Sequence, residues 1–362
     1  MSSPRRALAA ALCLFGPACA PEAPAYGAKY TLPDLKVFVY GYDQLCQGVL
    51  DALPAENERL RHALGSPPGE LITVAYGAEA VERFCLGDEP RAGCAARVGD
   101  KIQAVGGYGV LVHELAHAHR LARGVWHSPF IEEGLAEALQ AGTMYSYQAF
   151  SGKSTDLAAA LELERNELSQ IQIRDAAHLV SFLIETRGEE AAIEALSHPD
   201  GAPAGLQETL GLSLSELSQQ WTDAEDYIDR GTPCDHLPLL TLGEEGLSAD
   251  LDLACDESEV RGPKISDGAA AVWRTFCLDV ARPTSATLKL DVDVGTAKLT
   301  LKEAQDDCPF SEAASGGDLN KFIDAGEVVE VEFSECLWRA TIEAPLADAP
   351  IVSLRITPAP GD

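Results

Sequence analysis

The residues best suited to chemistry lie in His113-Glu114-Leu115-Ala116-His117. At about 3.6 residues per turn, the two histidines fall on one helix face, close enough together to hold one metal ion. Glu114 stands about 100° round the helix from that face. A carboxylate there cannot easily join the same tetrahedron, but it can reach a water molecule bound to the metal. The spacing therefore predicts a metal site with a base beside it.

A second segment, Phe130-Ile131-Glu132-Glu133-Gly134-Leu135-Ala136-Glu137, begins an apolar helix thirteen residues after the second histidine. Together the two segments resemble the gluzincin metallopeptidases, the thermolysin and zinc-aminopeptidase group, whose downstream Glu-Gly-x-Ala-like helix supplies a third ligand. The resemblance implies one Zn²⁺ ion held by His113, His117 and Glu133. Glu137 shares a face with Glu133, and the resemblance gives it the role of orienting a ligating histidine. Glu132 is the alternative third ligand.

Two imidazoles and one carboxylate leave a fourth zinc position for water, as in a catalytic site. Glu114 is then the general base that passes a proton from this water to the departing amine. The group also uses a Tyr or His from a later segment to stabilise the oxyanion. We favour His178 because it lies on a later helix, although a packing role fits it equally, and His119 faces away from the metal. The other available donors are Tyr145, Tyr147 and His127.

The chain before the motif reads as a small sheet with helices. We expect strands at Val37–Tyr40, Leu71–Tyr76 and Lys101–Val105, and helices at Asp43–Leu64, interrupted or kinked by Pro54, and Glu79–Phe84. A small sheet followed by the metal helix resembles the zincin architecture. The resemblance implies an edge strand that pairs with an extended peptide substrate, and Lys101–Val105 is our candidate for it.

After Glu137 the pattern stays helical, with helices expected at Leu157–Ser169, Asp175–Thr186 and Glu189–Ser197. The segments HLVSFLIETRGEEAAIEAL and GLSLSELSQQW resemble the helical C-terminal half of gluzincin-like bacterial peptidases. We therefore assign residues 30–230 to a zincin-like metallopeptidase domain.

Residues 235–360 change to an alternation of apolar and polar residues, as in Leu288, Leu290, Val292 and Val294. Period two in several short runs predicts an antiparallel β-sandwich or jelly-roll accessory domain. The fold class predicted for the whole chain is α+β. Acidic runs at 250–259 and 306–318 could bind calcium but lack EF-hand spacing, so we interpret them as solvated loops.

The formal charge of -30 excludes a nucleic-acid binder, because clustered Lys and Arg are absent. Residues 1–20 read as an export signal, with Arg5 and Arg6 before an apolar run too short to span a bilayer. Cys19 resembles the lipid-modified cysteine of bacterial lipoproteins. A lipid anchor there and free secretion, extracellular or periplasmic, both stay open, and the sequence leaves the oligomeric state undetermined.

Eight cysteines follow the signal, an even number that predicts disulfides in an exported chain. Three precede the motif helix and five follow residue 230, so complete pairing requires a bridge between the two groups. We expect Cys85 to pair with Cys94, and Cys46 with Cys234.

The function predicted is an exported zinc metallopeptidase that acts on peptides or proteins. Two alternatives remain, a catalytically inactive zincin-like surface binding protein and a zinc amidase acting on a cell-wall bond. The general base Glu114 favours an enzyme, because a binding module would not need it.

Overall fold

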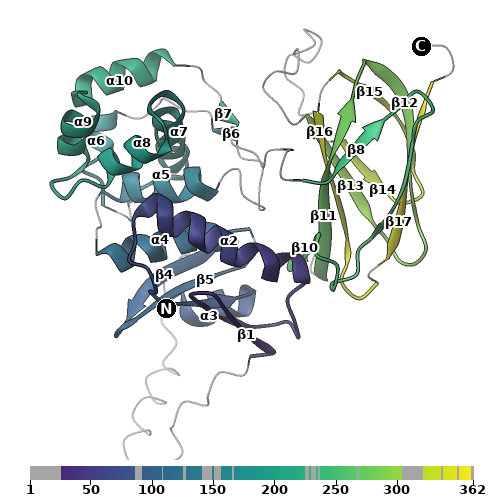
Figure 1. The fold of residues 1–362 in the computed structure, drawn as a ribbon, viewed down its shortest axis with the longest axis horizontal. Helices are drawn as coiled ribbons and strands as arrows, with labels where there is room; N and C mark the ends of the chain where they lie inside the picture. Colours follow the sequence, from purple (N-terminus) through teal and green to yellow (C-terminus); the bar gives the residue numbers. More distant parts are fainter. Residues whose placement is uncertain are drawn as a thin grey trace, which may run out of the picture.

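The computed structural model describes residues 26–85, 92–107, 109–124, 128–140, 149–150, 156–164, 167–224, 228–229, 234, 237–266, 269–303, 321–335, 337–348 and 350–359. These residues form a mixed α and β part and an all-β part (Figure 1). The α+β class is confirmed at this level. The export signal with Cys19, the donors His127, Tyr145 and Tyr147, the acidic run 306–318, Cys308 and Cys336 lie outside the described residues.

The first part is built on a five-stranded sheet in the order β1-β2-β3-β5-β4. Its strands are β1 (Ala28–Leu32), β2 (Leu35–Val39), β3 (Ile72–Tyr76), β4 (Gly93–Val98) and β5 (Lys101–Gly106). The central strands β2, β3 and β5 are parallel, whereas β1 and β4 pair antiparallel at the two edges. Successive side chains alternate between two cores, because Val74 belongs to the larger core and its neighbour Ala75 to a small one on the opposite face.

The edge strand predicted at Lys101–Val105 is wrong, because β5 lies between β3 and β4. The edge beside the motif helix belongs to β4, which forms a hairpin with β5. The prediction missed β4 because Gly-Cys-Ala-Ala-Arg-Val lacks the alternation of large apolar residues that indicates a strand.

Two helices connect the strands of this sheet, and the motif helix follows it. The connecting helices are α2 (Gln47–Leu64) and α3 (Ala78–Phe84), and the motif helix is α4 (Leu111–Arg123). The interruption predicted at Pro54 is wrong, since α2 runs through this residue. The two ends of α2 are fixed, the first by a disulfide at Cys46 and the second by Gly65 in the left-handed conformation. α3 belongs to the small core, whereas α2 and α4 pack in the larger one.

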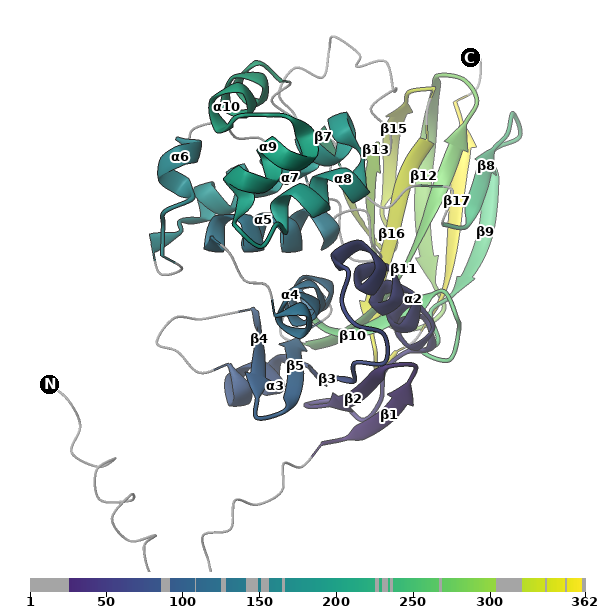
Figure 2. The same cartoon turned by 60° about the vertical axis from the view of Figure 1, so that its left-hand side comes forward.

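The following segments form a helical layer above α4 (Figure 2). Its helices are α5 (Pro129–Gln140), α6 (Leu157–Ala160), α7 (Gln170–Arg187), α8 (Glu189–Leu196), α9 (Ala202–Leu210) and α10 (Leu214–Asp223), with two short paired strands, β6 (Ala149–Phe150) and β7 (Ile228–Asp229). The helix predicted from Leu157 to Ser169 is too long, because Ser169 caps the next helix. The hydroxyl of Ser169 accepts from the amide of Gln172 and begins α7, whereas α6 already ends at Ala160.

The all-β part consists of two sheets around a second core. One sheet has the order β10-β11-β16-β13-β14 with β8 beside β11, and the other has the order β15-β12-β17-β9. The strands are β8 (Leu239–Leu242), β9 (Leu247–Asp252), β10 (Val260–Ser266), β11 (Ala269–Val280), β12 (Thr284–Val292), β13 (Lys298–Glu303), β14 (Lys321–Asp324), β15 (Val328–Phe333), β16 (Leu337–Pro345) and β17 (Ile351–Pro358). Alternate residues of strands such as β17 are buried, as their period-two sequences predict.

The two parts are joined at the first turn of α2. Cys46 forms a disulfide with Cys255, and the amides of Cys46 and Gln47 donate to the carbonyls of Gly262 and Cys255. At Gly48 a Cβ would lie 2.6 Å from carbonyl oxygens of the all-β part, so only glycine permits this approach. Carbonyl groups of the all-β part therefore cap the first amides of α2, which has no capping side chain of its own.

Three disulfides are present among the described residues. The pairing of Cys85 with Cys94 is confirmed, and so is a bridge between the two cysteine groups. The pairing of Cys46 with Cys234 is wrong, because Cys234 bonds Cys277. The disulfides are consistent with an oxidising, exported compartment. Among the described residues, no helix is long and apolar enough to cross a membrane.

Candidate metal centre

The helix α4 is a central element of its domain, because every residue from Leu111 to Arg120 is buried. It begins directly after β5, where the amide of Leu111 donates to the carbonyl of Gly107. It ends at Gly124, which adopts the left-handed conformation that favours glycine. Burial on all sides fixes the face that carries the two motif histidines.

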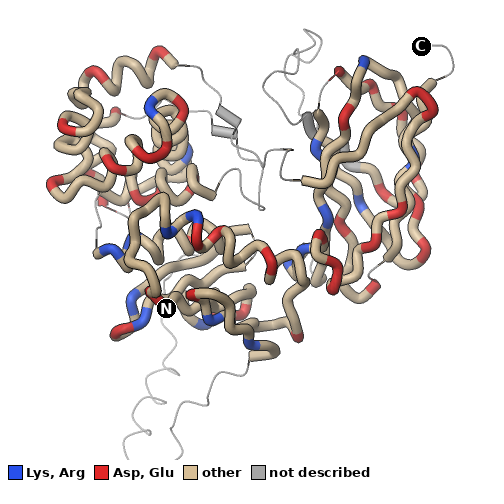
Figure 3. The backbone as a smooth tube through the Cα atoms, viewed as in Figure 1, with Lys and Arg blue, Asp and Glu red and all other residues tan. Residues whose placement is uncertain are grey.

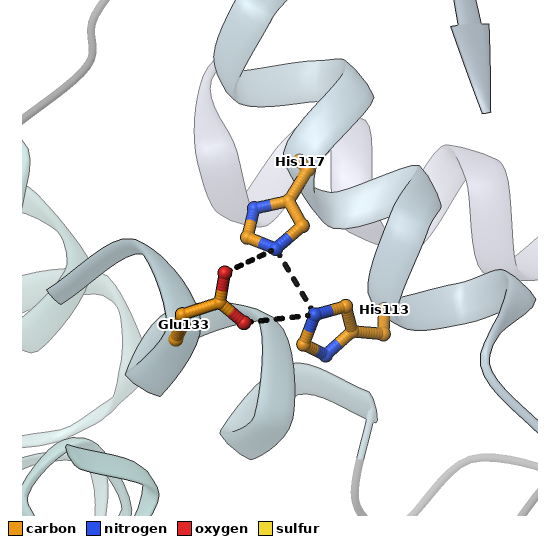
Figure 4. A group of neighbouring side chains, drawn as sticks. All are labelled: His113, His117 and Glu133. Carbon is orange, nitrogen blue, oxygen red and sulfur yellow. Dashed lines mark hydrogen bonds and ion pairs between the residues drawn. The ribbon is translucent and has the colours of Figure 1, made fainter. Parts of the chain in front are cut away.

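His113, His117 and Glu133 come together between α4 and α5 (Figure 4). The two Nε2 atoms are 3.0 Å apart, and Glu133 places its oxygens 3.3 Å from Nε2 of His113 and 3.6 Å from Nε2 of His117. Ligands about 2.0–2.1 Å from a tetrahedral zinc ion lie roughly 3.3 Å from one another. The donor set and its spacing therefore fit one metal ion of this size.

Glu137 follows Glu133 by one helical turn and approaches the other nitrogen of His113. Its Oε1 lies 3.4 Å from Nδ1. His113 thus has a carboxylate beside each ring nitrogen. A carboxylate at the outer nitrogen fixes the ring orientation and raises the basicity of the nitrogen that faces the metal.

Gly134, in the middle of the Glu-Gly-x-Ala segment, explains how α5 reaches this position. A Cβ at residue 134 would lie 2.7 Å from the carbonyl oxygen of Ala176 on α7. The missing side chain lets α5 and α7 pack backbone to backbone. Glycine at this place is therefore a packing requirement of the helix that carries Glu133.

The carboxylates create a negative potential around the histidines. Burial by itself lowers the pKa of His113, but Glu133, Glu137 and Glu114 together raise it to about 10. Burial opposes the ionisation of Glu133, yet its hydrogen bonds with His113 and His117 hold the pKa of this carboxyl well below its usual range. The same negative potential favours a divalent cation between these side chains.

Glu114 is 5% exposed and faces the edge strand. A Cβ at Gly93, the first residue of β4, would lie 2.7 Å from Oε1 and 2.8 Å from Cγ of Glu114. The general base predicted from the sequence therefore lies against β4. Gly93 is a site residue that the sequence did not reveal, because its importance depends on a contact between strand and helix.

Glu132, the alternative ligand, is not part of the metal group. Its carboxylate accepts two hydrogen bonds from Arg120, at 2.9 and 2.7 Å, and both residues are 1% exposed. Sequence reasoning also missed Arg120. The sequence offered one indication of its role. Arg120 is a charged residue three positions after His117, on a helix that the motif already placed in the interior.

The other two predicted histidines have packing contacts. His178 is fully buried, and its Nδ1 accepts a hydrogen bond from the indole of Trp221 at 2.7 Å. His119, on the far side of α4, contacts Ser66 at 2.7 Å and Asn57 at 3.1 Å. Burial lowers the pKa of His119 to about 4. Such contacts support the packing role considered for His178 and the structural role of His119.

Within the described residues, His113, His117 and Glu133 are the one group arranged to hold a metal ion. The acidic run 250–259 forms ordinary surface contacts instead, since Asp250 accepts from Ser353 and Glu259 pairs with Arg274. Acidic residues are spread over both parts of the chain (Figure 3). The run 250–259 begins inside β9, which ends at Asp252, so only residues 253–259 form the loop predicted there.

The chain matches none of the known protein-family models and none of the curated proteins with which it was compared.

Proposed function

We propose that the chain is an exported zinc metallopeptidase of the gluzincin type, with a zincin-like domain at residues 30–230. The observation that carries this proposal is the convergence of His113, His117 and Glu133 beside a buried Glu114. Two imidazole nitrogens and one carboxylate are the ligands of hydrolytic zinc sites, and they leave a position open. This donor set supports zinc as the metal.

Bound zinc supplies Lewis-acid activation of a water molecule and of the scissile carbonyl group. Glu114 performs the proton transfer, because its carboxylate first accepts a proton as the nucleophile forms. It then returns that proton to the nitrogen of the departing amine. A buried carboxylate held against Gly93 keeps this base in a fixed place.

The edge strand β4 supports a peptide as the substrate. Among the described residues, β4 has a neighbouring strand on one side only, and Gly93 at its start lies against Glu114. An extended peptide that adds to this edge would pass directly in front of the base. The substrate strand is thus assigned to β4 instead of the predicted Lys101–Val105.

The test combines zinc content with cleavage of a diverse peptide library. We expect one zinc ion per chain, and cleavage that falls by about 10²-fold or more in Glu114→Gln while zinc stays bound. Glu82→Gln is the matched control, because Glu82 is an exposed carboxylate on α3.

Each alternative has its own outcome in this experiment. Protein without stoichiometric zinc would contradict both enzyme hypotheses. Zinc without any cleavage, and without a difference between the wild type and Glu114→Gln, would indicate a binding protein. Hydrolysis of cell-wall amides but not of peptides would indicate the amidase.

A further inference from the structure

The pair of Arg120 and Glu132 joins the same two helices as the metal group. Two nitrogens of the guanidinium donate to the two carboxylate oxygens, and Nη1 also donates to the hydroxyl of Ser197 at 2.6 Å. Ser197 directly follows α8. One buried side chain therefore connects α4, α5 and α8.

The positions of the pair along their helices relate it to the ligands. Arg120 lies three residues after His117, and Glu132 directly precedes Glu133. Each partner is thus within one turn of a ligand on its own helix. Two parallel hydrogen bonds between planar groups fix both the distance and the orientation of the helices that carry them.

Energetics argue against stability as the main role of the pair. A buried ion pair contributes little more than well-packed apolar residues of the same volume, because desolvation offsets the attraction. The geometry that the pair imposes is specific, however, since Glu133 must reach two imidazole nitrogens from another helix.

We infer that Arg120 and Glu132 are positioning residues, which hold α5 at the distance from α4 at which Glu133 completes the metal group. This inference rests on the proposed zinc function. The adjacent glutamates then have separate roles. Glu132 sets the spacing of the helices, and Glu133 binds the metal.

The test measures the zinc dissociation constant of the full chain by competition with a chromophoric chelator, together with the melting temperature of the metal-free protein. The double variant Arg120→Met/Glu132→Leu replaces the pair by apolar side chains and should fold. We expect its melting temperature to stay near that of the wild type while its zinc affinity falls by about 10- to 100-fold. Arg120→Lys, which keeps the charge but not the paired bonds, should lose affinity as well.

Ser66→Ala is the matched control, because it removes an equally buried contact of α4, to His119, that does not involve α5. We expect it to lower the melting temperature and to leave zinc affinity unchanged. A double variant that binds zinc as tightly as the wild type would overturn the inference, and so would an equal loss of affinity in the control. A wild-type chain that takes up no zinc would instead overturn the proposed function.

Discussion

Gly93 leaves the space that the carboxylate of Glu114 occupies. A methyl group at residue 93 would meet Oε1 and Cγ of Glu114 and the carbonyl oxygen of Val105. The side chain of Glu114 can move away from such a methyl group, whereas the backbone oxygen of Val105 is held in the sheet, so the start of β4 must shift as well.

Substitution Gly93→Ala should therefore displace the base without touching a metal ligand. We expect kcat/KM for peptide cleavage to fall by about 10²-fold, because a misplacement of about 1 Å has an effect of this size. Zinc content should be unchanged. Gly107→Ala is the control, since a Cβ there meets no atom within 4 Å. Equal activity of Gly93→Ala and the wild type would show that Glu114 does not act from this position.

Glu137→Gln should weaken zinc binding while leaving the ligand atoms in place. The glutamine amide beside Nδ1 of His113 carries no charge, so Nε2, the nitrogen that faces the metal, becomes a poorer ligand. We expect zinc affinity to fall by about 10- to 100-fold in a chelator competition. Glu137→Asp, which keeps the charge on a shorter side chain, should lose less. An unchanged affinity in Glu137→Gln would remove Glu137 from the site.

Stability should fall between pH 6.5 and 4 because of His119. Burial lowers the pKa of His119 from 6.5 to about 4, so the unfolded chain takes up the proton first. The folded state is therefore fully stabilised above pH 6.5 and loses on the order of 3 kcal/mol as the pH falls to 4. Urea unfolding of the metal-free protein at several pH values measures this slope. His119→Gln should flatten it, and an identical slope in this variant would contradict the assignment.

The disulfide between Cys46 and Cys255 should contribute to stability across the two parts. It connects residues 209 positions apart, and its removal in Cys46→Ser/Cys255→Ser should cost about 2–4 kcal/mol. The matched control is Cys85→Ser/Cys94→Ser, whose loop spans 9 positions and whose loss should cost less. Chemical unfolding of both variants gives the comparison. A smaller effect for the long-range bridge would contradict this ranking.

Local spacing made the metal group predictable. His113 and His117 are one turn apart, so a helical period was enough to place them on one face. The strands β12 and β17 were predictable for the same reason, since one face of each is buried. Glu133 was instead assigned from the resemblance of its contiguous motif to that of a known family.

Features that depend on distant partners were not predictable. Arg120 finds Glu132 and Ser197, and Cys46 finds Cys255, only after helices and sheets have packed. The long strand β11 also lacks strict alternation, because several consecutive residues are buried on both faces. The residue that a charged side chain, a cysteine or a glycine contacts is determined by the tertiary structure. No periodic pattern in the sequence indicates it.

The cap on α2 has a consequence for the order in which the protein matures. The first amides of α2 are satisfied by carbonyls at residues 255 and 262, and α2 contacts α4 through Asn57 and His119. At a synthesis rate of about 5–20 residues per second, on the order of 10 seconds separate the completion of α5 from that of β10. Throughout this interval residues 113, 117 and 133 have been synthesised, but the carbonyl groups that cap the start of α2 have not. We therefore expect zinc to be acquired late, in the compartment where the disulfides form.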